Sequence, residues 1–194
     1  VPLLSTRVKV HVLGSDARQD PVVYEEHDPS FYVSVAKTGD DRRVMIVLRS
    51  TDTSEVLTID PDHPAGTPVA LTPRTRGHKY TADHQDGRWV ILTDWQAPNF
   101  RLMTVPDARI GDRAQWRELV AHNSQVFIAN FALFKGFLAI NERSGGSLRV
   151  RYMPWDQPQK SRFIPADDPA YAKRLDVNAE QDTEVLRVSY SALA

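Results

Sequence analysis

Residues 43–50 read RVMIVLRS, an apolar run that follows the turn residues TGDD at 38–41. The same plan, a turn and then an apolar run, returns three more times at intervals of 45 to 48 residues. The four runs are VMIVL at 44–48, WVILT at 89–93, FLAIN at 137–141 and EVLRV at 184–188. Two shorter segments are also similar, HDPSF at 27–31 and DDPAY at 167–171. They lie 140 residues apart, which is close to three such periods. Repeats of this length are typical of a few architectures, one of which is the four-stranded blade of a β-propeller.

The chain is predicted to be almost entirely β, because apolar and polar residues alternate or form short β-branched runs between turn signals. Among those turns, Gln85-Asp86-Gly87 and Ser144-Gly145-Gly146 are expected to close hairpins. We therefore expect an all-β fold, a β-propeller fragment with three complete four-stranded blades in the units 31–74, 78–121 and 126–165. The expected strands are 31–37, 43–50, 54–60 and 67–73, then 79–84, 88–94, 99–105 and 116–121, then 126–134, 137–142, 147–153 and 160–165.

The two ends of the chain are predicted to hold half a blade each, at 7–25 and 170–191. Strands are expected at 7–13 and 21–25, as the last two of a unit, and at 171–176 and 184–191, as the first two. An open sheet edge exposes unpaired N–H and C=O groups, and propellers protect their edges by closing the ring. One hypothesis is therefore that the half-blades pair and close a four-bladed ring. The alternative is a three-blade arc with swapped or intermolecular strands.

Composition excludes several classes of function. Twenty-four Lys and Arg against 25 Asp and Glu give a formal charge of −1, so no overall field attracts nucleic acid or an anionic membrane. The absence of cysteine excludes disulfides, thiolate zinc sites and a cysteine nucleophile, and it suits a reducing compartment. No apolar stretch approaches the roughly 20 residues of a membrane-spanning helix. We expect a cytoplasmic protein with neither nucleic acid nor a membrane as partner.

No catalytic, cofactor-binding or metal-ligating residue is assigned from the sequence, and the substrate-binding residues stay unknown. His78 and His84 are predicted to share one face of a strand, but Asp83 points to the other face, which favours polar strand residues over a metal site. Ser144 lies in a glycine turn, without the strand-to-helix setting common for a catalytic serine. The two glycines that follow it lack the spacing of a phosphate-binding loop, so hairpin geometry accounts for them better.

The remaining charged and aromatic residues are interpreted as structural. Arg149 and Arg151 share a strand face near Arg143 and Trp155, and a solvated face is favoured over a nucleic-acid stripe. If a catalytic domain binds the propeller through ion pairs, these arginines are candidate donors. Three carboxylate pairs are not taken as acid/base dyads, because strand neighbours face opposite ways: Glu25-Glu26, Asp40-Asp41 and Asp167-Asp168. Four tryptophans are assigned to packing: Trp89, Trp95, Trp116 and Trp155.

A series of further segments runs through nearly the whole chain. The segments are YEEHDPSFYV at 24–33, TSEV at 53–56, HKYTADH at 78–84, NFRL at 99–102, WRELV at 116–120, ERSGG at 142–146, DDPAY at 167–171 and LRVSYSAL at 186–193. In this order and spacing the series resembles the propeller of oligopeptidase B, in the prolyl oligopeptidase family. Each segment alone is a short strand or turn pattern, so the order is what makes the resemblance specific.

The resemblance implies a serine peptidase of two domains. An α/β-hydrolase domain carries the catalytic triad, and a seven-bladed propeller covers the active site and keeps folded proteins out. Oligopeptidase B members of the family cut short peptides after Arg or Lys. By this resemblance, the chain corresponds to the later blades of the propeller. The chain contains no G-x-S-x-G nucleophile elbow, so the catalytic domain is absent from it and no triad residue is assigned. The implied partners are that catalytic domain and short basic peptides; no cofactor is implied, and the chain alone is expected to be inactive.

Two other functions stay open. The first is an independent small propeller that binds a protein or peptide partner. A reading frame that continues into a G-x-S-x-G motif would eliminate it. The second is an enzyme in its own right, such as a propeller glycoside hydrolase, which needs inward carboxylates from several blades. No such carboxylate set recurs at the repeat positions.

Overall fold

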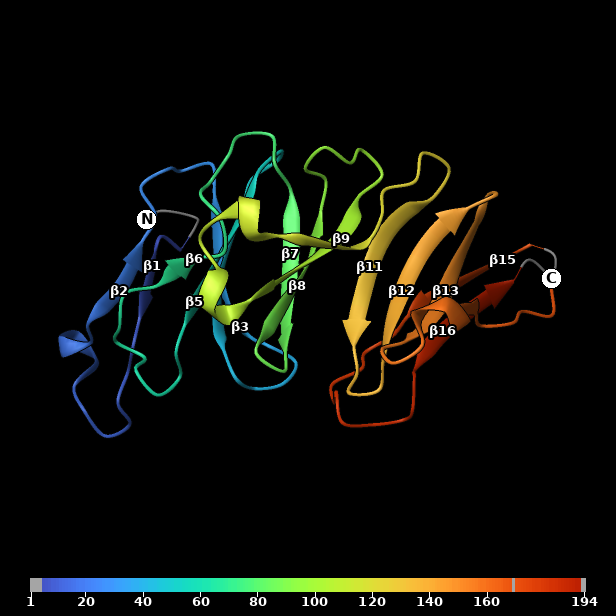
Figure 1. Ribbon diagram of the computed structural model, residues 1–194. Coiled ribbons are helices and arrows are strands. Elements are labelled where there is room, and N and C mark those ends of the chain that lie inside the picture. Colours follow the sequence, from blue (N-terminus) through green and yellow to red (C-terminus); the bar gives the residue numbers. More distant parts are fainter. Residues whose placement is uncertain (1–4, 169, 193–194) are drawn as a thin grey trace. The chain divides into compact units, whose positions relative to one another are not determined.

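The computed structural model describes residues 5–168 and 170–192, and the secondary structure within them is almost entirely β (Figure 1). The helical elements in this part of the chain are four 3-10 turns of three residues each. They are η1 (Ala17–Gln19), η2 (Asp107–Arg109), η3 (Arg113–Gln115) and η4 (Pro158–Lys160). None of these turns has the length and apolar content that crossing a membrane requires. The predicted all-β class is confirmed.

The first predicted unit forms a four-stranded sheet in the order β3-β4-β5-β6. Its strands are antiparallel, and β4 pairs with both β3 and β5 without a register shift. Ile46 and Leu48 of β4 are fully buried, so the recurring apolar run lies in the middle of the sheet. The strands are β3 (Tyr32–Lys37), β4 (Val44–Arg49), β5 (Ser54–Ile59) and β6 (Val69–Ala70).

The second predicted unit also forms a four-stranded sheet, in the order β10-β9-β8-β7. Its first hairpin turns at Asp86 and Gly87, whose φ angles are 52° and 72°. Positive φ at both central residues is what a two-residue type I′ turn requires, so the predicted hairpin turn at 85–87 is confirmed. The strands are β7 (Tyr80–Gln85), β8 (Arg88–Thr93), β9 (Arg101–Pro106) and β10 (Arg117–Val120).

The third predicted unit forms the antiparallel series β11-β12-β13, with β14 paired to β13. Gly145 and Gly146 turn the second hairpin with φ angles of 57° and 80°. A Cβ on either residue would have no heavy atom within 4 Å, so the positive φ angle rather than crowding favours glycine here. The strands are β11 (Phe127–Leu133), β12 (Phe137–Ser144), β13 (Ser147–Pro154) and β14 (Arg162–Phe163).

Each pair of end strands belongs to its own sheet in the described residues. β1 (Arg7–Lys9) and β2 (Val22–Glu25) form their own two-stranded sheet. β15 (Tyr171–Leu175) and β16 (Val188–Ala192) join the sheet of β13, where Leu148 and Ala172 form a parallel pair. Val8 and Val23 of the N-terminal sheet pack against the core of the first sheet. The closing of a four-bladed ring by the two half-blades stays a prediction.

The fourth recurring run is shorter as a strand than predicted. β16 begins at Val188, and 184–187 belong to the preceding loop. Asn178 occupies the hydrogen-bonding groups of Arg187: its Oδ1 accepts from the Arg187 N–H at 2.8 Å, and its Nδ2 donates to the Arg187 carbonyl at 3.1 Å. The strands predicted at 7–13 and 160–165 are likewise reduced to the short β1 and β14.

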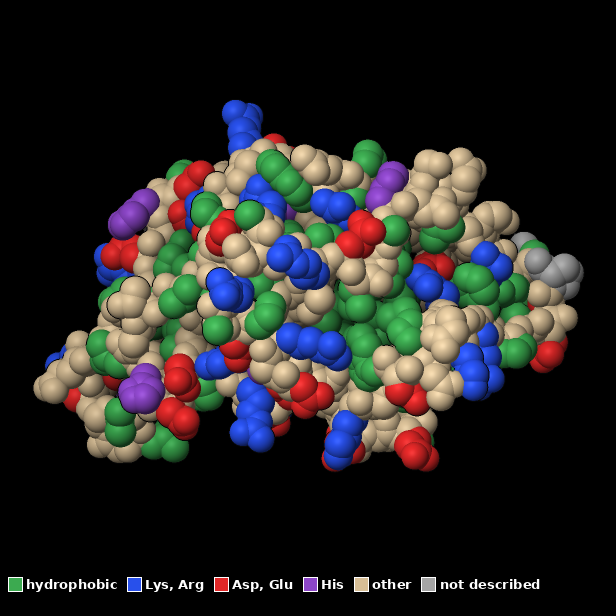
Figure 2. Space-filling view, viewed as in Figure 1, with side chains coloured by type: hydrophobic (Ala, Val, Ile, Leu, Met, Phe, Trp, Pro, Cys, Tyr) green, Lys and Arg blue, Asp and Glu red, His purple; other side chains and the backbone are tan. Residues whose placement is uncertain are grey.

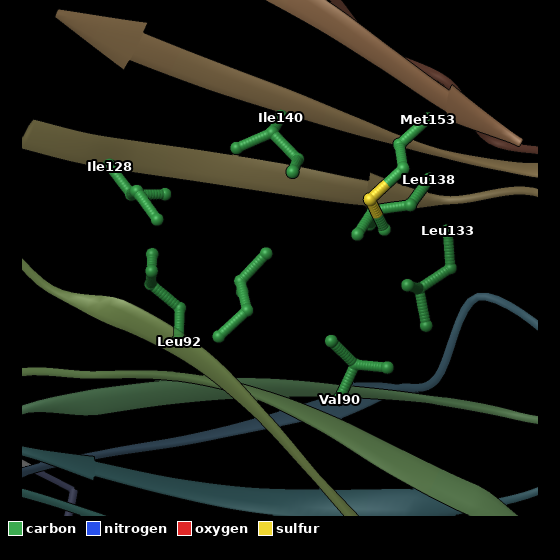
Figure 3. Packing of buried hydrophobic residues seen from close by; sticks show 8 residues of the cluster. Val90, Leu92, Ile128, Leu133, Leu138, Ile140 and Met153 are labelled. Atoms are coloured by element: carbon green, nitrogen blue, oxygen red, sulfur yellow. The ribbon is translucent and has the colours of Figure 1, made fainter. Parts of the chain in front are cut away.

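Close contacts divide the chain into two compact units. Of the described residues, those up to Trp89 and Val105–Arg117 form unit 1, and Val90–Thr104 with those from Glu118 onward form unit 2. Figure 3 shows a core of unit 2, where Ile128 and Ile140 point toward Leu92. The buried members of this core are Val90, Leu92, Leu102, Ile128, Leu133, Leu138, Ile140 and Met153. A core of unit 1 is formed by Phe31, Ile46, Leu48, Leu57 and Ile59.

Replacing Ile140 by Ala tests this core. Ile140 is fully buried, so the change removes apolar contacts and leaves a cavity. We expect the free energy of unfolding to fall by about 2–5 kcal/mol, measured by urea unfolding. Val177→Ala is the control, because Val177 is 76% exposed and its replacement is expected to cost under about 0.5 kcal/mol. Equal effects of the two changes would contradict the placement of Ile140.

Candidate functional site

The structure gives His78 and His84 different surroundings. His78 precedes β7, stacks on Tyr80 with ring centroids 4.9 Å apart, and has its Nδ1 3.2 Å from Nη2 of Arg113. His84 lies within β7, with its Nδ1 2.6 Å from Oδ2 of Asp40. β7 begins at Tyr80, so His78 lies just before the strand that holds His84. Within 5–168 and 170–192, no group of three His, Asp or Glu side chains is placed to hold a metal ion.

The basic residues of β13 are paired within the chain. Arg151 donates from Nε to Oε1 of Glu142 at 2.7 Å, and the side chains are only 20% and 5% exposed. Arg149 hydrogen-bonds the hydroxyl of Ser144 and lies 4.0 Å from the centroid of the Phe163 ring. Both arginines are partly exposed, and β12 and β14 bring a carboxylate, a hydroxyl and a ring to them. Ser144 thus serves as a partner for Arg149 in the hairpin.

The adjacent carboxylates bind separate partners. Glu25 pairs with Arg7 at 2.8 Å, while Glu26 pairs with Arg74 at 2.5 Å. The other pairings are Asp40 with His84, Asp41 with Lys37 at 2.6 Å, and Asp168 with the hydroxyl of Tyr190. The structure buries Trp89 and Trp116 and leaves Trp95 and Trp155 half-buried. The contacts of the adjacent carboxylates are structural, since each carboxylate neutralises or orients a different group.

Charged side chains of both signs are mixed on the face of the protein that Figure 2 shows. Lys and Arg side chains lie among Asp and Glu side chains over that face, in keeping with the formal charge of −1. A mixed surface of this kind favours solubility over the attraction of a polyanion.

A half-buried cluster around Arg74 is the candidate functional site of unit 1. Arg74 follows β6, and its Nη2 contacts Oε2 of Glu26 at 2.5 Å while its Nε contacts Oε2 of Glu55 at 2.8 Å. Nη2 also lies 3.2 Å from the hydroxyl of Tyr24. The guanidinium carbon sits 4.1 Å from the centroid of the Phe31 ring, within range of a cation–π contact. One side chain therefore connects β2, the segment between β2 and β3, β5 and the segment after β6.

The electrostatics of the Arg74 cluster favour full ionisation. Burial by itself raises the pKa of Glu26, but hydrogen bonds from Arg74, from the Asp28 N–H and from Tyr24 outweigh burial and lower it to about 2. Burial, followed by the hydrogen bond to Glu26, raises the pKa of Tyr24. Burial by itself lowers the pKa of Arg74. The hydrogen bonds to Glu26 and Glu55 outweigh burial, so the pKa of Arg74 is raised overall. A carboxylate with a pKa near 2 does not serve as a general acid or base near neutrality.

Arg74 also borders a pocket of about 490 Å³. The pocket lies among the segment before β3, the turn between β4 and β5 and the segment after β6. Its lining residues are Asp28, Ser30, Phe31, Ser50, Thr51, Asp52, Thr53, Arg74 and Arg76. Hydroxyls and charges of both signs can hold a polar ligand by hydrogen bonds. The arrangement offers binding and rigidity, whereas acid–base chemistry is not supported by its ionised glutamate.

Sequence reasoning missed Arg74. Glu26 and Phe31 belong to the segment at 24–33 that carries the resemblance, and Glu55 belongs to the segment at 53–56. Arg74 itself lies in the connection TPRTRG at 72–77, whose composition indicates only a turn. The signal that could have found it is the presence of two glutamates in apolar surroundings, because buried carboxylates need a cation.

Repeated antiparallel sheets built around a buried second strand define the chain as a β-propeller fold. Residues 3–194 match the family described as prolyl oligopeptidase, N-terminal beta-propeller domain. The chain belongs to this propeller family, and the resemblance found in the sequence is confirmed.

Three similar proteins illustrate the relationship. Dipeptidyl aminopeptidase BI of Pseudoxanthomonas mexicana is 40% identical over 192 residues, which are 98% of this chain and 26% of the relative. Oligopeptidase B from Leishmania major has a TM-score of 0.88 at 27% identity, covering 99% of this chain and 28% of that one. Oligopeptidase B from Trypanosoma brucei, in a closed form with covalently bound antipain, has a TM-score of 0.86 at 24% identity, covering 97% and 28%. The chain thus spans about a quarter of the length of these proteins.

Removing the Arg74 guanidinium tests the cluster. Arg74→Ala leaves Glu26 and Glu55 buried without their cation, so we expect the free energy of unfolding to fall by about 3–5 kcal/mol. Arg74→Lys is expected to recover only part of this loss, because an ammonium lacks the fork that reaches both carboxylates. Arg76→Ala is the control, since the Arg76 side chain is almost fully exposed and its contact with Asp52 is long, at 3.9 Å. Denaturant unfolding at neutral pH measures all three, and a loss for Arg74→Ala no larger than for Arg76→Ala would contradict the assignment.

His78 predicts a dependence of stability on pH. Burial, followed by the charge of Arg113, lowers the pKa of His78 to about 4, so the unfolded chain binds this proton more readily. Stability contributed by neutral His78 is fully present above the unfolded pKa of about 6.5 and is lost as the pH falls toward 4. From pH 6 to pH 5, we expect this residue to reduce the free energy of unfolding by about 1 kcal/mol.

His78→Gln is expected to remove this pH-dependent component, whatever its effect on stability at neutral pH. Urea unfolding at pH 6 and pH 5 measures the difference between native and variant chains. His63→Gln is the control, because the His63 side chain is 80% exposed. An unchanged pH dependence in His78→Gln would contradict the buried neutral state.

Proposed function

We propose that the chain is the non-catalytic propeller portion of a serine peptidase of the prolyl oligopeptidase family. The observation that carries the proposal is the family match over residues 3–194, together with the absence of G-x-S-x-G from the sequence. The chain covers about a quarter of each similar peptidase, so an α/β-hydrolase domain outside these residues supplies the nucleophile. The propeller gates and size-selects peptide substrates for that domain.

A gate of this kind needs sheets that keep their shape while substrates pass. The Arg74 cluster supports this role, because it fixes the segment before β3 to β5 and to the segment after β6 through two short ion pairs. Such a connection among three segments restrains their separation. The pocket beside Arg74 adds hydroxyls and charges to which a peptide can be hydrogen-bonded as it passes.

The proposed substrates are short peptides cut after Arg or Lys. Similarity to two solved structures of oligopeptidase B supports this specificity. A second candidate is the removal of dipeptides from the N-terminus of peptides. The chain is 40% identical to a relative named dipeptidyl aminopeptidase BI and 27% identical to oligopeptidase B from Leishmania major, and the higher identity favours this second candidate. The two activities differ in whether a free N-terminus is required.

Chromogenic peptides distinguish the two activities in the full protein that contains this chain. Turnover of an N-terminally blocked Arg p-nitroanilide, but not of its Ala counterpart, is the expected result. Cleavage of unblocked dipeptidyl p-nitroanilides alone would contradict cleavage after Arg or Lys and would support the removal of dipeptides from the N-terminus. Turnover of neither class would overturn the peptidase proposal and favour an independent peptide-binding propeller.

Gating is tested by substrate size in the same protein. A ten-residue peptide with one Arg is expected to be cut, whereas folded ribonuclease A is expected to remain intact. The 194-residue chain by itself is expected to cut neither, because it lacks a nucleophile elbow. Cleavage of folded ribonuclease A at a rate comparable to the peptide would contradict size selection.

A further inference from the structure

Unit 2 contains a pocket of about 610 Å³ that the proposed function does not use. Three segments form it: the β11–β12 hairpin with the start of β12, β13, and the loop between β15 and β16. A pocket of this size suits a small organic group. Its lining residues are Lys135, Gly136, Phe137, Tyr152, Asp182, Thr183 and Glu184.

One side of the pocket is aromatic. The rings of Phe137 and Tyr152 have centroids 4.8 Å apart, and Phe137 stacks on Phe134 at 4.3 Å. Both phenylalanines are buried, so the rings are held in place. Ring faces carry partial negative charge and attract cations. The guanidinium carbon of Arg162 lies 5.5 Å from the Tyr152 ring centroid, within range of a cation–π contact.

The loop between β15 and β16 also lines the pocket and is held by hydrogen bonds. The N–H of Lys135 donates to the carbonyl of Gln181 at 2.9 Å, which fixes the loop to the β11–β12 hairpin. The hydroxyl of Thr183 accepts from the N–H of Val185 at 3.1 Å. A loop ordered before a ligand arrives loses less conformational freedom on binding.

The charges on the loop are unequal. Asp182 pairs with Lys135 at 3.1 Å, and both side chains are exposed. Glu184 makes no hydrogen bond or ion pair with the described part of the chain and lines the same pocket. One carboxylate is therefore left without a counter-ion beside two aromatic rings. A group that satisfies both surfaces carries positive charge on an apolar stem.

We propose that this pocket binds an organic cation, an ammonium or guanidinium group on an aliphatic stem. Glu184 is the counter-ion, and the stem lies against Phe137 and Tyr152. Two sources share this chemistry, a free alkyl guanidine or amine and a Lys or Arg side chain of a peptide. The pocket lies wholly within unit 2, and its chemistry does not depend on whether the protein is a peptidase.

The test is calorimetric titration of the full protein with butylguanidine and with butylurea, its neutral counterpart of similar shape. We expect butylguanidine to bind at least about fivefold more tightly than butylurea. Glu184→Gln is expected to weaken butylguanidine binding about fivefold, and Tyr152→Leu is expected to weaken it as well. Glu180→Gln is the matched control, because Glu180 is exposed in the same loop and does not line the pocket.

Only binding that changes with Glu184 is assigned to this pocket, which separates it from any cation site elsewhere in the protein. Competition between butylguanidine and an arginine tripeptide blocked at both ends identifies the source: displacement by the peptide supports a side chain, and its failure supports a free cation. Equal binding of butylurea, or no effect of Glu184→Gln, would overturn the proposal. This result does not depend on peptide cleavage, so the two proposals fail separately.

Discussion

Burial of both faces of the second strand in each of the three larger sheets is the constraint on which the rest of the structure depends. In β8 the consecutive residues Trp89, Val90 and Ile91 have no exposed surface, although neighbours on a strand point to opposite faces. Leu138 to Ile140 in β12 are buried in the same way. Each large apolar side chain buried in this manner contributes about 1.5–3 kcal/mol. A strand covered on both faces needs partner strands beside it and packed side chains above and below, which the turns and the repeat provide.

The polar groups follow from the same constraint. Glu26 and Glu55 lie close to the core of unit 1, and Glu142 lies on the buried strand β12. A buried carboxylate is costly unless a cation and hydrogen bonds compensate it, and Arg74 and Arg151 supply both. These pairs explain why a chain with 25 acidic residues shows paired rather than catalytic carboxylates at these positions. They suit a rigid portion of a peptidase more than a centre of chemistry.

Much of the fold could be predicted because turn and strand signals are local. The hairpins at Asp86-Gly87 and Gly145-Gly146 need only residues that accept positive φ. The prediction failed at 184–187, where apolar alternation indicated a strand but Asn178 binds both backbone groups of Arg187. The candidate site was predicted less well than the strands. Its glutamates lie in the segments that resemble the family, whereas the cation between them lies in a connection that carries no local signal.

The sequence by itself determined the β class, the four-strand period and the family, because these depend on neighbours along the chain and on the order of short segments. Only the tertiary structure decided which charges meet. Arg74 and Glu26 are 48 residues apart, and Lys135 and Asp182 are 47 apart. The tertiary structure also decided that the end strands pair within separate sheets. The physical reason is that ion pairs and sheet edges form between segments that packing brings together. The positions of residues along the chain do not reveal which distant segments pack against each other.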